Sequence, residues 1–293
     1  MIYCIWNNKG GVGKTFLTFT LANEHAFRNP DKKILLVDMC PQANLSEIML
    51  GGDGDGDKKL DNLLVKRTTV GGYFDERITS PHITTGSETN YLLHGNDYNS
   101  SLTDNVYFLC GDPSLELQSQ AINQIGSQTL PADTWKNIHK WLKNLIDACV
   151  RKLGNSESVD VFIDCNPSFS SYTELALVAS DNIIIPCSCD DSSARALHNV
   201  RNLVYENSKV YDGINFFSKC NRNGLQLPLI RAIVLNRTTL YNTKANSAFQ
   251  AMFDKIKRVA LQFKTDLPNF FVSGGTDFAE ILDHHSIAIV FGS

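Results

Sequence analysis

The stretch Asn7-Asn8-Lys9-Gly10-Gly11-Val12-Gly13-Lys14-Thr15 decides how this chain of 293 residues is interpreted. It lies between a predicted strand, Ile2–Trp6, and a predicted helix, Phe16–Phe27. Glycines permit a tight turn and let successive backbone N–H groups point at one anion. The start of the helix adds the positive end of its dipole. This order of elements predicts a loop that cradles phosphate groups.

A lysine and a threonine close the stretch and supply its remaining chemistry. Lys14 can reach the β- and γ-phosphates of a nucleotide, and Thr15 can offer its hydroxyl to Mg²⁺. The general phosphate-loop pattern has glycine where this chain has Asn8. The remaining run, Lys9 to Thr15, is longer and more specific than that pattern. A glycine-rich turn followed by Lys-Thr by chance is the alternative, and acidic residues further along the chain argue against it.

Two later apolar runs end in aspartate. Asp38 follows Ile34–Val37, and Asp164 follows Val159–Ile163. Ligands of open α/β sheets bind at the carboxyl ends of the strands, so both carboxylates are expected beside the phosphate loop. A carboxylate in that place can hold Mg²⁺ through water. A single acid after a strand is often only a helix cap, but two of them with this loop favour a metal site.

The order of apolar runs predicts the fold. Besides those already named, strands are predicted at Val106–Leu109, Asn182–Pro186 and Leu229–Leu235. Most runs are apolar without alternation, which is typical of parallel strands covered on both faces. Helices are predicted between and after them, at Trp135–Leu153, Arg195–Tyr211 and Ala245–Phe263. We therefore predict an α/β fold with a doubly wound, mostly parallel sheet flanked by helices.

No linker divides the chain, so we expect a single domain, residues 1–293, with a polar and acidic insertion at about 51–105. In the insertion, Gly51–Asp57 is predicted as a flexible acidic loop, and residues 68–105 as an extended segment with little regular structure. A calcium site in the loop is disfavoured because the glutamate that ends an EF-hand loop is missing.

Composition indicates an ordinary globular protein, with 43% hydrophobic and 20% charged residues. No run of about 18 apolar residues occurs, which disfavours a membrane span. The eight cysteines form no C-x-x-C pair, and several lie in apolar runs. Zinc binding and disulfides are therefore disfavoured, and a reducing cytoplasm fits best.

Charge is distributed unevenly along the chain. From Glu47 to Glu116 there are 12 acidic residues and five Lys or Arg, a net charge of −7. From Arg195 to Thr265 there are 12 Lys or Arg and three acidic residues, a net charge of +9. A segment this basic in an acidic protein indicates an anionic partner or a solvated basic face.

Three motifs together resemble the ParA/MinD family of deviant Walker ATPases, and its ParA branch in particular. The run from Lys9 to Thr15 matches the family's loop K-G-G-x-G-K-T. Val37-Asp38-Met39-Cys40-Pro41-Gln42 matches its D-x-D-P-Q motif in part, and Asp164-Cys165-Asn166-Pro167-Ser168 matches its D-C-x-P-S motif. The resemblance extends over most of the chain and is weak between residues 51 and 105.

The resemblance implies an ATP-binding molecular switch that forms an ATP-dependent sandwich homodimer and hydrolyses ATP with Mg²⁺. Lys9 matches the lysine that reaches the partner's nucleotide, and Asn236 resembles the position that reads adenine. The implied catalytic residues are Lys9, Lys14 and Asp38, and the implied metal ligands are Thr15, Asp38 and Asp164. The implied nucleotide-binding residues are Lys9, Gly10, Gly11, Val12, Gly13, Lys14, Thr15, Phe16 and Asn236.

Two departures from the family pattern bear on activity. Cys40 stands where the family has a second aspartate, and a neutral thiol is a poor hydrogen-bond acceptor. We therefore expect slow hydrolysis with nucleotide binding retained. Phe16 stands where a hydroxyl is common, so one α-phosphate contact is expected to be missing, at a cost of about 1 kcal/mol.

The ParA branch implies partners in DNA partition or segregation. These are a ParB-like adaptor protein and DNA bound without sequence preference, which would place the protein at the nucleoid in the cytoplasm. The basic candidates for DNA contact are Arg195, Arg201, Lys209, Lys219, Arg222, Lys244, Lys255, Lys257 and Arg258. Membrane attachment is disfavoured, because the C-terminal run Ile287–Ser293 has no basic face.

Two other functions remain open from the sequence. The first is a nucleotide-gated regulator that docks a protein partner through the insertion, with little hydrolysis and no DNA binding; Cys40 and the acidic insertion favour it. The second is a reductase resembling the nitrogenase iron protein, whose dimer is bridged by an iron–sulfur cluster. Cys110 and Cys149 fit core positions better than cluster ligands, which disfavours the reductase.

Overall fold

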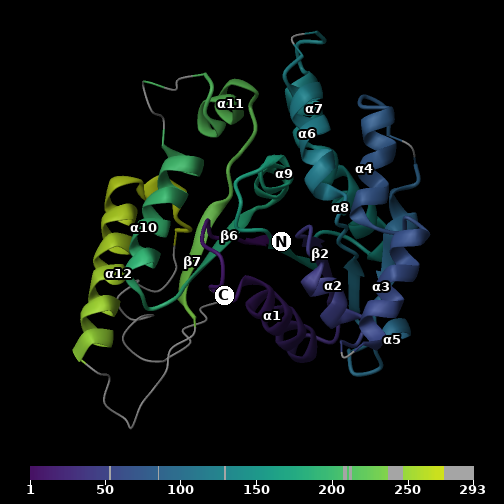
Figure 1. Cartoon of the computed structure of the whole chain (residues 1–293), viewed down its shortest axis with the longest axis horizontal. Coiled ribbons are helices and arrows are strands. Elements are labelled where there is room, and N and C mark those ends of the chain that lie inside the picture. Colours follow the sequence, from purple (N-terminus) through teal and green to yellow (C-terminus); the bar gives the residue numbers. More distant parts are fainter. Residues whose placement is uncertain are drawn as a thin grey trace.

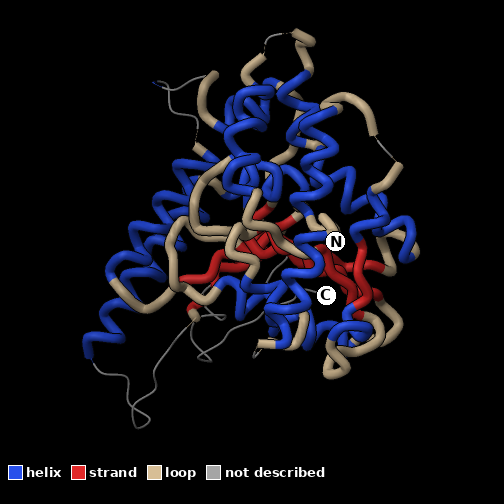
Figure 2. The backbone as a smooth tube through the Cα atoms, turned by 45° about the vertical axis from the view of Figure 1, so that its right-hand side comes forward, coloured by secondary structure: helices blue, strands red, loops and turns tan. Residues whose placement is uncertain are grey.

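The computed structural model describes residues 1–52, 54–84, 86–128, 130–206, 210, 213–236 and 247–273, with side chains of the last range from residue 251. A seven-stranded sheet runs through the middle of the molecule, with helices on both faces (Figures 1 and 2). The strands are β1 (Ile2–Ile5), β2 (Lys33–Met39), β3 (Leu92–His94), β4 (Val106–Leu109), β5 (Val159–Cys165), β6 (Asn182–Cys187) and β7 (Leu229–Leu235).

The strand order is β3-β4-β2-β5-β1-β6-β7, and only the β3–β4 pair is antiparallel. This confirms the predicted doubly wound, mostly parallel sheet. The glycine-rich stretch follows β1, which is the third strand from one edge and is enclosed by β5 and β6. β5 and β6 are buried along their whole length, as expected for mostly apolar parallel strands covered on both faces.

Helices cover the two faces of the sheet unequally. The helices are α1 (Lys14–Arg28), α2 (Asn44–Met49), α3 (Asp55–Val65), α4 (Val70–Thr79), α5 (Gly95–Tyr98), α6 (Leu115–Gly126), α7 (Thr134–His139), α8 (Trp141–Leu153), α9 (Ser171–Ala179), α10 (Asp191–Val200), α11 (Phe216–Arg222) and α12 (Ser247–Asp266). Helices α1, α2 and α3 share one hydrophobic core with one face of the sheet. The opposite core takes residues from α4, from α6 to α9 and from α10 to α12.

The predicted strands agree with the structure to within two residues at each end, but two predicted helices are wrong in their bounds. The helix expected at Arg195–Tyr211 begins earlier, at Asp191, and its helical residues end at Tyr205, since Glu206 is extended. The single helix expected at Trp135–Leu153 is divided into α7 and α8 at Lys140. The ring of His139 makes a 2.9 Å hydrogen bond from Nδ1 to the carbonyl of Trp135. That side chain thus shares an acceptor that the helical backbone also uses, next to the residue at which the helix is divided.

The insertion is also more regular than predicted. Residues 55–98 contain α3, α4, the 3₁₀ turn Glu88–Tyr91, β3 and α5, instead of an extended segment. Thr69 begins α4, because its hydroxyl accepts a 3.0 Å hydrogen bond from the N–H of Gly72. Tyr73 and Phe74 on this helix are fully buried in the main core. The insertion is therefore an integral layer of the fold.

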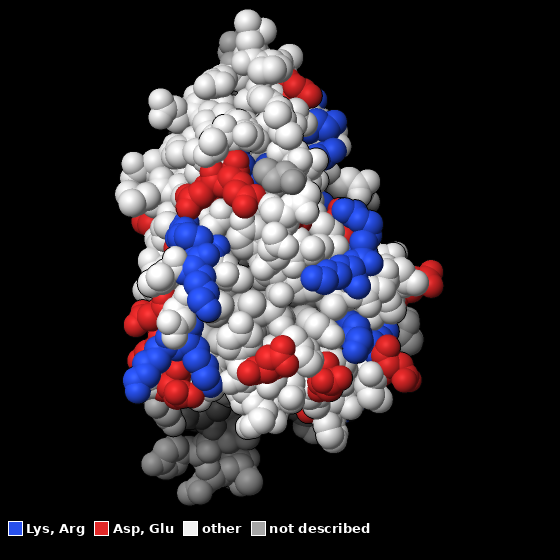
Figure 3. Space-filling view, turned by 90° about the vertical axis from the view of Figure 1, so that its right-hand side faces the viewer, with Lys and Arg blue, Asp and Glu red and all other residues white. Residues whose placement is uncertain are grey.

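The insertion side of the molecule does not present one continuous acidic surface. Figure 3 shows that face with Lys and Arg interspersed among Asp and Glu. The Gly51–Asp57 loop is short, since α3 already begins at Asp55. Among the residues that the structure describes, no helix has the length and apolar character needed to cross a membrane.

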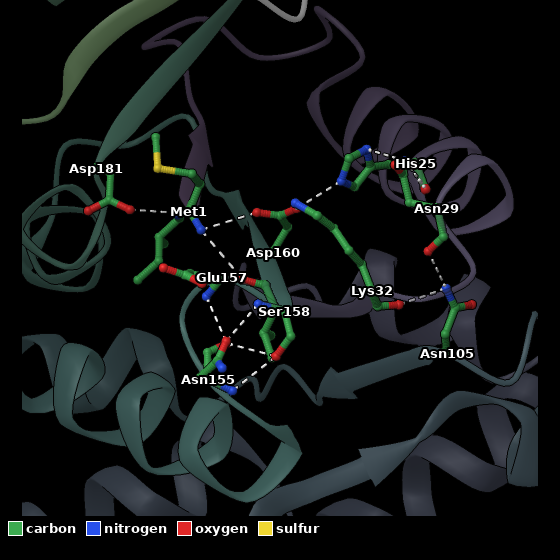
Figure 4. Close-up of polar contacts among 12 residues, drawn as sticks. Met1, His25, Asn29, Lys32, Asn105, Asn155, Glu157, Ser158, Asp160 and Asp181 are labelled. Atoms are coloured by element: carbon green, nitrogen blue, oxygen red, sulfur yellow. Dashed lines mark hydrogen bonds and ion pairs between the residues drawn. The ribbon is translucent and has the colours of Figure 1, made fainter. Parts of the chain in front are cut away.

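One polar network joins residues at the amino-terminal ends of the central strands β1 and β5 (Figure 4). Asp160 of β5 accepts hydrogen bonds from Lys32 Nζ at 2.8 Å, from His25 Nε2 at 2.9 Å and from the main-chain nitrogen of Met1 at 3.1 Å. Its side chain is 6% exposed. Burial alone would raise the pKa of Asp160, but these donors hold the pKa well below its usual range.

Candidate nucleotide-binding site

The phosphate loop, residues 7–15, has the backbone that its glycines predict. Gly11 and Gly13 adopt left-handed conformations, with φ of 73° and 78°. Gly13 is the residue that precedes α1, so the helix begins at Lys14. A Cβ atom added at Gly10 or Gly11 would meet nothing within 4 Å. The two glycines therefore have open space where a side chain would begin.

Lys14 folds back over this loop. Its side chain is buried, and Nζ donates to the carbonyl of Lys9 at 2.8 Å and to that of Asn7 at 3.3 Å. Burial lowers the pKa of Lys14, while the nearby carboxylate of Asp164 opposes that effect. A buried ammonium held only by carbonyls is poised to exchange them for phosphate oxygens.

Asp164 is held by the first turn of α1. Thr15 Oγ1 donates to Asp164 Oδ2 at 2.7 Å, and Thr18 Oγ1 lies 3.4 Å from Asp164 Oδ1. Asp164 is fully buried near the end of β5. The predicted metal ligands Thr15 and Asp164 are thus in direct contact, and Thr18 is a further contact that the sequence analysis missed.

Asp38 lies beside Asp164, since the two residues are paired between β2 and β5. Its oxygens are engaged by Cys40 N at 3.0 Å, Ser46 N at 2.9 Å and Ser46 Oγ at 2.7 Å. Ser46 Oγ in turn accepts from the N–H of Gly111 at 2.8 Å. Asp38 is therefore fixed by its own chain, which favours contact with a metal through water over direct coordination.

The two adjacent carboxylates fit a divalent cation. Burial raises the pKa of Asp38, against the hydrogen bonds from Ser46 and Cys40. Burial and the negative charge of Asp38 raise the pKa of Asp164, against Thr15 and Lys14. With Thr15 they offer only oxygen ligands, the donor set that Mg²⁺ prefers. A cation placed between them would relieve their mutual repulsion.

Cys40 carries a neutral thiol. Its side chain is almost completely buried beside Asp38. Burial and the charge of Asp38 raise the pKa of the Cys40 thiol to about 12. At neutral pH this position therefore supplies neither a negative charge nor a strong hydrogen-bond acceptor.

Lys9 is held by a cluster at the start of α10, which we call the Lys9 clasp: Ser188, Asp190 and Ser193. Lys9 Nζ donates to Ser188 Oγ at 2.7 Å and to Ser193 Oγ at 3.2 Å, and it forms an ion pair with Asp190. Asp190 also caps α10, accepting from the N–H of Ser193 at 3.0 Å. Partial burial would raise the pKa of Asp190, but the hydrogen bonds from Lys9 and its serine neighbours lower it.

The other predicted binding residues surround the loop in different ways. Val12 is fully buried, whereas Phe16 is 66% exposed on the first turn of α1. Asn236 Nδ2 donates to the carbonyl of Val12 at 3.0 Å, so this residue does lie against the phosphate loop. Asn7 Nδ2, which the sequence analysis did not single out, donates to the carbonyl of Pro186 at 2.7 Å and ties the loop to β6.

The segment after Asp164 lies against the phosphate loop. Asn8 Nδ2 donates to the carbonyl of Pro167 at 3.2 Å, and Asn199 of α10 donates to Asn8 Oδ1 at 3.2 Å. The rings of Trp6 and Phe169 approach to 5.7 Å between centroids. Asn8, which departs from the general phosphate-loop pattern, thus bridges three parts of the site.

Other predicted features can also be placed. No group of three or more His, Cys, Asp or Glu side chains that could hold a metal ion occurs in the described ranges. Cys110 and Cys149 are fully buried in the core. Among the basic candidates, Arg201 pairs with Asp266 at 2.6 Å and Lys255 pairs with Asp191 at 2.7 Å. Lys209, Lys244 and Ile287–Ser293 lie outside the described residues.

Comparisons with known proteins show the family of this chain. The family model described as AAA domain matches residues 1–94 and 137–216, which is more than half of the chain. The chromosome partitioning protein ParA of Myxococcus xanthus is 28% identical over 252 residues, covering 86% of this chain and 69% of that protein. An uncharacterised protein of Mycobacterium tuberculosis is 27% identical over 215 residues, covering 73% of this chain. The chain spans only 54% of the length of that relative.

Solved structures share the fold. Cyanothece McdA without nucleotide has a TM-score of 0.61 at 15% identity, covering 92% of this chain and 90% of McdA. Cobyrinic acid a,c-diamide synthase from Mycobacterium smegmatis, with bound ADP and magnesium, has a TM-score of 0.52 at 20% identity, covering 88% of this chain and 81% of the synthase. From the matched family model, the partition relative and the phosphate loop itself, the chain belongs to the AAA domain family of ParA/MinD-type P-loop proteins.

Proposed function

We propose that the protein is an ATP-binding switch of ParA type, which dimerises around ATP and hydrolyses it slowly. The observation that carries this proposal is the arrangement of the phosphate loop: Lys14 folds over the loop, Thr15 donates to the buried Asp164, and Asp38 lies beside Asp164 on the neighbouring strand. This arrangement offers cations and N–H groups to phosphates, and oxygen ligands to Mg²⁺.

Each residue has a defined role in this proposal. Lys14 exchanges the carbonyls of Asn7 and Lys9 for β- and γ-phosphate oxygens. Thr15 and Asp164 would hold Mg²⁺, with Asp38 acting through water. When bound, the metal would neutralise charge on the phosphates. Cys40 offers the attacking water no strong acceptor, which supports slow turnover.

Lys9 links nucleotide binding to dimerisation. In the single chain it is held by the Lys9 clasp. We propose that in the dimer Lys9 leaves the clasp and contacts the γ-phosphate bound to the partner, where negative charge is greatest. Release of Lys9 then depends on a triphosphate across the interface, so the dimer senses ATP and not ADP.

Light scattering tests this proposal directly. The mass of the protein is measured with Mg·ADP, Mg·ATP and a slowly hydrolysed ATP analogue. We expect a dimer only with the triphosphates, and none for Lys14→Ala. The proposal would be contradicted by a mass that is the same with every nucleotide. It would also be contradicted if Lys14→Ala bound Mg·ATP as tightly as the unaltered chain.

DNA binding is part of the same proposal. The net charge of +9 between Arg195 and Thr265 supports it. Among the candidates, Arg195 and Arg258 are exposed on α10 and α12, which pack together. Two such surfaces in one dimer would bind a polyanion more tightly than one, so ATP would control DNA affinity through avidity. A ParB-like adaptor is the partner expected to stimulate turnover.

A further inference from the structure

The hydroxyl of Tyr172 is a meeting point for three side chains from different parts of the site. It accepts a hydrogen bond from Asn166 Nδ2 at 3.1 Å and lies 2.9 Å from Ser168 Oγ. It donates to Glu116 Oε2 at 3.2 Å, across to α6. Asn166 and Ser168 belong to the segment that follows Asp164, which we call the Asp164 loop, residues 165–170.

Counting donors and acceptors assigns the direction of each bond. A tyrosine hydroxyl has one proton and two acceptor positions. Its proton goes to the Glu116 carboxylate, since a charge-assisted bond is the stronger one. Asn166 occupies one acceptor position, and Ser168 must then donate to the other. All three positions are filled, so the hydroxyl is fully satisfied although the tyrosine is only 1% exposed.

The Asp164 loop is therefore fastened on two sides. On one side Asn8 of the phosphate loop donates to the carbonyl of Pro167. On the other side Tyr172 fastens Asn166 and Ser168 to α6 through Glu116. The loop continues directly from the carboxyl end of β5, so its position affects the surroundings of the Asp164 carboxylate that contacts Thr15.

We propose that Tyr172 is a positioning residue of the nucleotide site. Its hydroxyl fixes the Asp164 loop relative to α6, and it transmits movement of that loop to α6 when the nucleotide changes. The functional part of this inference rests on the proposed function, whereas the fixing of the loop does not. The ring itself has a separate role, because it packs in the main core with Leu115 and Leu175.

A single substitution separates these two roles. Tyr172→Phe removes the hydroxyl and keeps the ring. Tyr205→Phe is a matched control, because Tyr205 is also 1% exposed and its hydroxyl donates to the carbonyl of Pro228 at 2.8 Å, in another part of the core. Both variants keep the buried ring and lose one buried hydroxyl each, and they differ in whether the Asp164 loop is affected.

Hydrogen exchange of the nucleotide-free protein tests the fixing of the loop. We expect residues 166–170 and the first turn of α6 to exchange at least about fivefold faster in Tyr172→Phe, with no change there in Tyr205→Phe. Equal exchange of these segments in the two variants would overturn the inference. This outcome does not depend on whether the protein binds ATP.

Nucleotide measurements then test the functional part. In Tyr172→Phe we expect the Kd for Mg·ADP to stay within about twofold, because the phosphate loop is intact, while kcat falls at least about fivefold. Glu116→Gln, which keeps an acceptor but loses the charge, should give a smaller loss. A kcat equal to that of Tyr205→Phe would overturn the transmitting role. If the unaltered chain binds no nucleotide, the proposed function fails, and the exchange result still decides the positioning role.

Discussion

Two aspartates on one strand, Asp160 and Asp164, have opposite electrostatic surroundings. Asp160 is surrounded by donors at the amino-terminal end of β5, whereas Asp164 faces Asp38 at the carboxyl end. The first has a lowered pKa and the second a raised pKa. One strand thus carries a stabilising polar network at one end and a proposed cation ligand at the other.

Asparagine at these two positions should change stability in opposite directions. The raised pKa of Asp164 means that its ionised form is disfavoured by folding, a cost that is absent below the unfolded pKa and grows as pH rises through the folded pKa. Asp164→Asn should therefore raise the Tm of the nucleotide-free protein at pH 8, and less so at pH 5. It should also abolish the rise in Tm caused by Mg·ATP.

Asp160→Asn is expected to do the reverse. Its lowered pKa contributes stability above the unfolded pKa, which is lost as pH falls through the folded pKa. The substitution should cost about 2 kcal/mol at pH 7, because Lys32 and His25 lose a buried charged partner. Urea unfolding at pH 7 and pH 3 measures this. A Tm shift of the same sign in both asparagine variants would contradict the electrostatic assignment.

The Lys9 clasp leads to a second prediction at the scale of single residues. Asp190→Asn should lower the protein concentration needed for ATP-dependent dimerisation about two- to fivefold, since asparagine keeps the helix cap but loses the charge that holds Lys9. The control is Asp191→Asn, the next residue, which pairs with Lys255 instead. Sedimentation at several protein concentrations gives both values. Dimerisation unchanged in Asp190→Asn would show that the clasp does not restrain Lys9.

At the scale of elements, two glycines in the first turn of α4 are closely surrounded by other atoms. A Cβ atom at Gly72 would lie 1.9 Å from the carbonyl oxygen of Arg67, and one at Gly71 would lie 2.5 Å from the side chain of Asp112. Both contacts are far below van der Waals distance. The turn between α3 and α4 therefore closes only with glycine.

Alanine at Gly72 should destabilise the insertion by about 2 kcal/mol or more, as overpacking against backbone does. Gly126→Ala is the matched control, because a Cβ atom there meets only side-chain atoms of Trp135 at 3.6 Å and Ile138 at 3.8 Å. That variant should be neutral or slightly stabilised. Chemical denaturation of both proteins provides the comparison, and equal loss in the two would contradict the packing argument.

The same elements show how far sequence alone could predict this protein. The phosphate loop and the pair Asp38 and Asp164 were predictable, because each follows an apolar strand and parallel strands bring their carboxyl ends together. α4 was not, because Gly71 and Gly72 disfavour a helix and only the Thr69 cap and burial of Phe74 stabilise it. Whether such a segment forms a helix depends on its tertiary contacts, which the sequence pattern does not show.

Several site residues were unpredictable for the same reason. Ser46 reaches Asp38 only because α2 turns back over β2, and Tyr172 reaches Glu116 only because α9 packs on α6. Asp190 carried a usable signal that was overlooked, since an acid after an apolar strand and three residues before a serine is typical of a helix cap.

At the scale of the whole molecule, acidic and basic residues are concentrated in different segments of the chain, although the net charge is only −4. Ion pairs already engage part of the basic segment, as Arg201 with Asp266 shows. Under the proposed DNA binding, we therefore expect the exposed Arg195 and Arg258 to matter more than the total count of basic residues.

Retention of the protein on DNA tests the expected role of these two arginines. With Mg·ATP at about 0.1 M salt we expect binding that weakens steeply as salt rises, and little binding with Mg·ADP. Arg195→Glu combined with Arg258→Glu should weaken it about tenfold or more. Arg28→Glu is the control, an exposed arginine of α1 paired with Glu24. Binding that changes neither with salt concentration nor with the nucleotide would contradict the proposed DNA binding.

The contact of Trp6 with Phe169 has a practical consequence. Trp6 stands at the mouth of β1, and its indole ring packs on the segment whose position is proposed to follow the nucleotide. Indole emission is sensitive to the dipoles and rings around it, so displacement of Phe169 would alter its colour and intensity. The molecule thus carries its own optical probe, and stopped-flow mixing with nucleotide could time the rearrangement without any added dye.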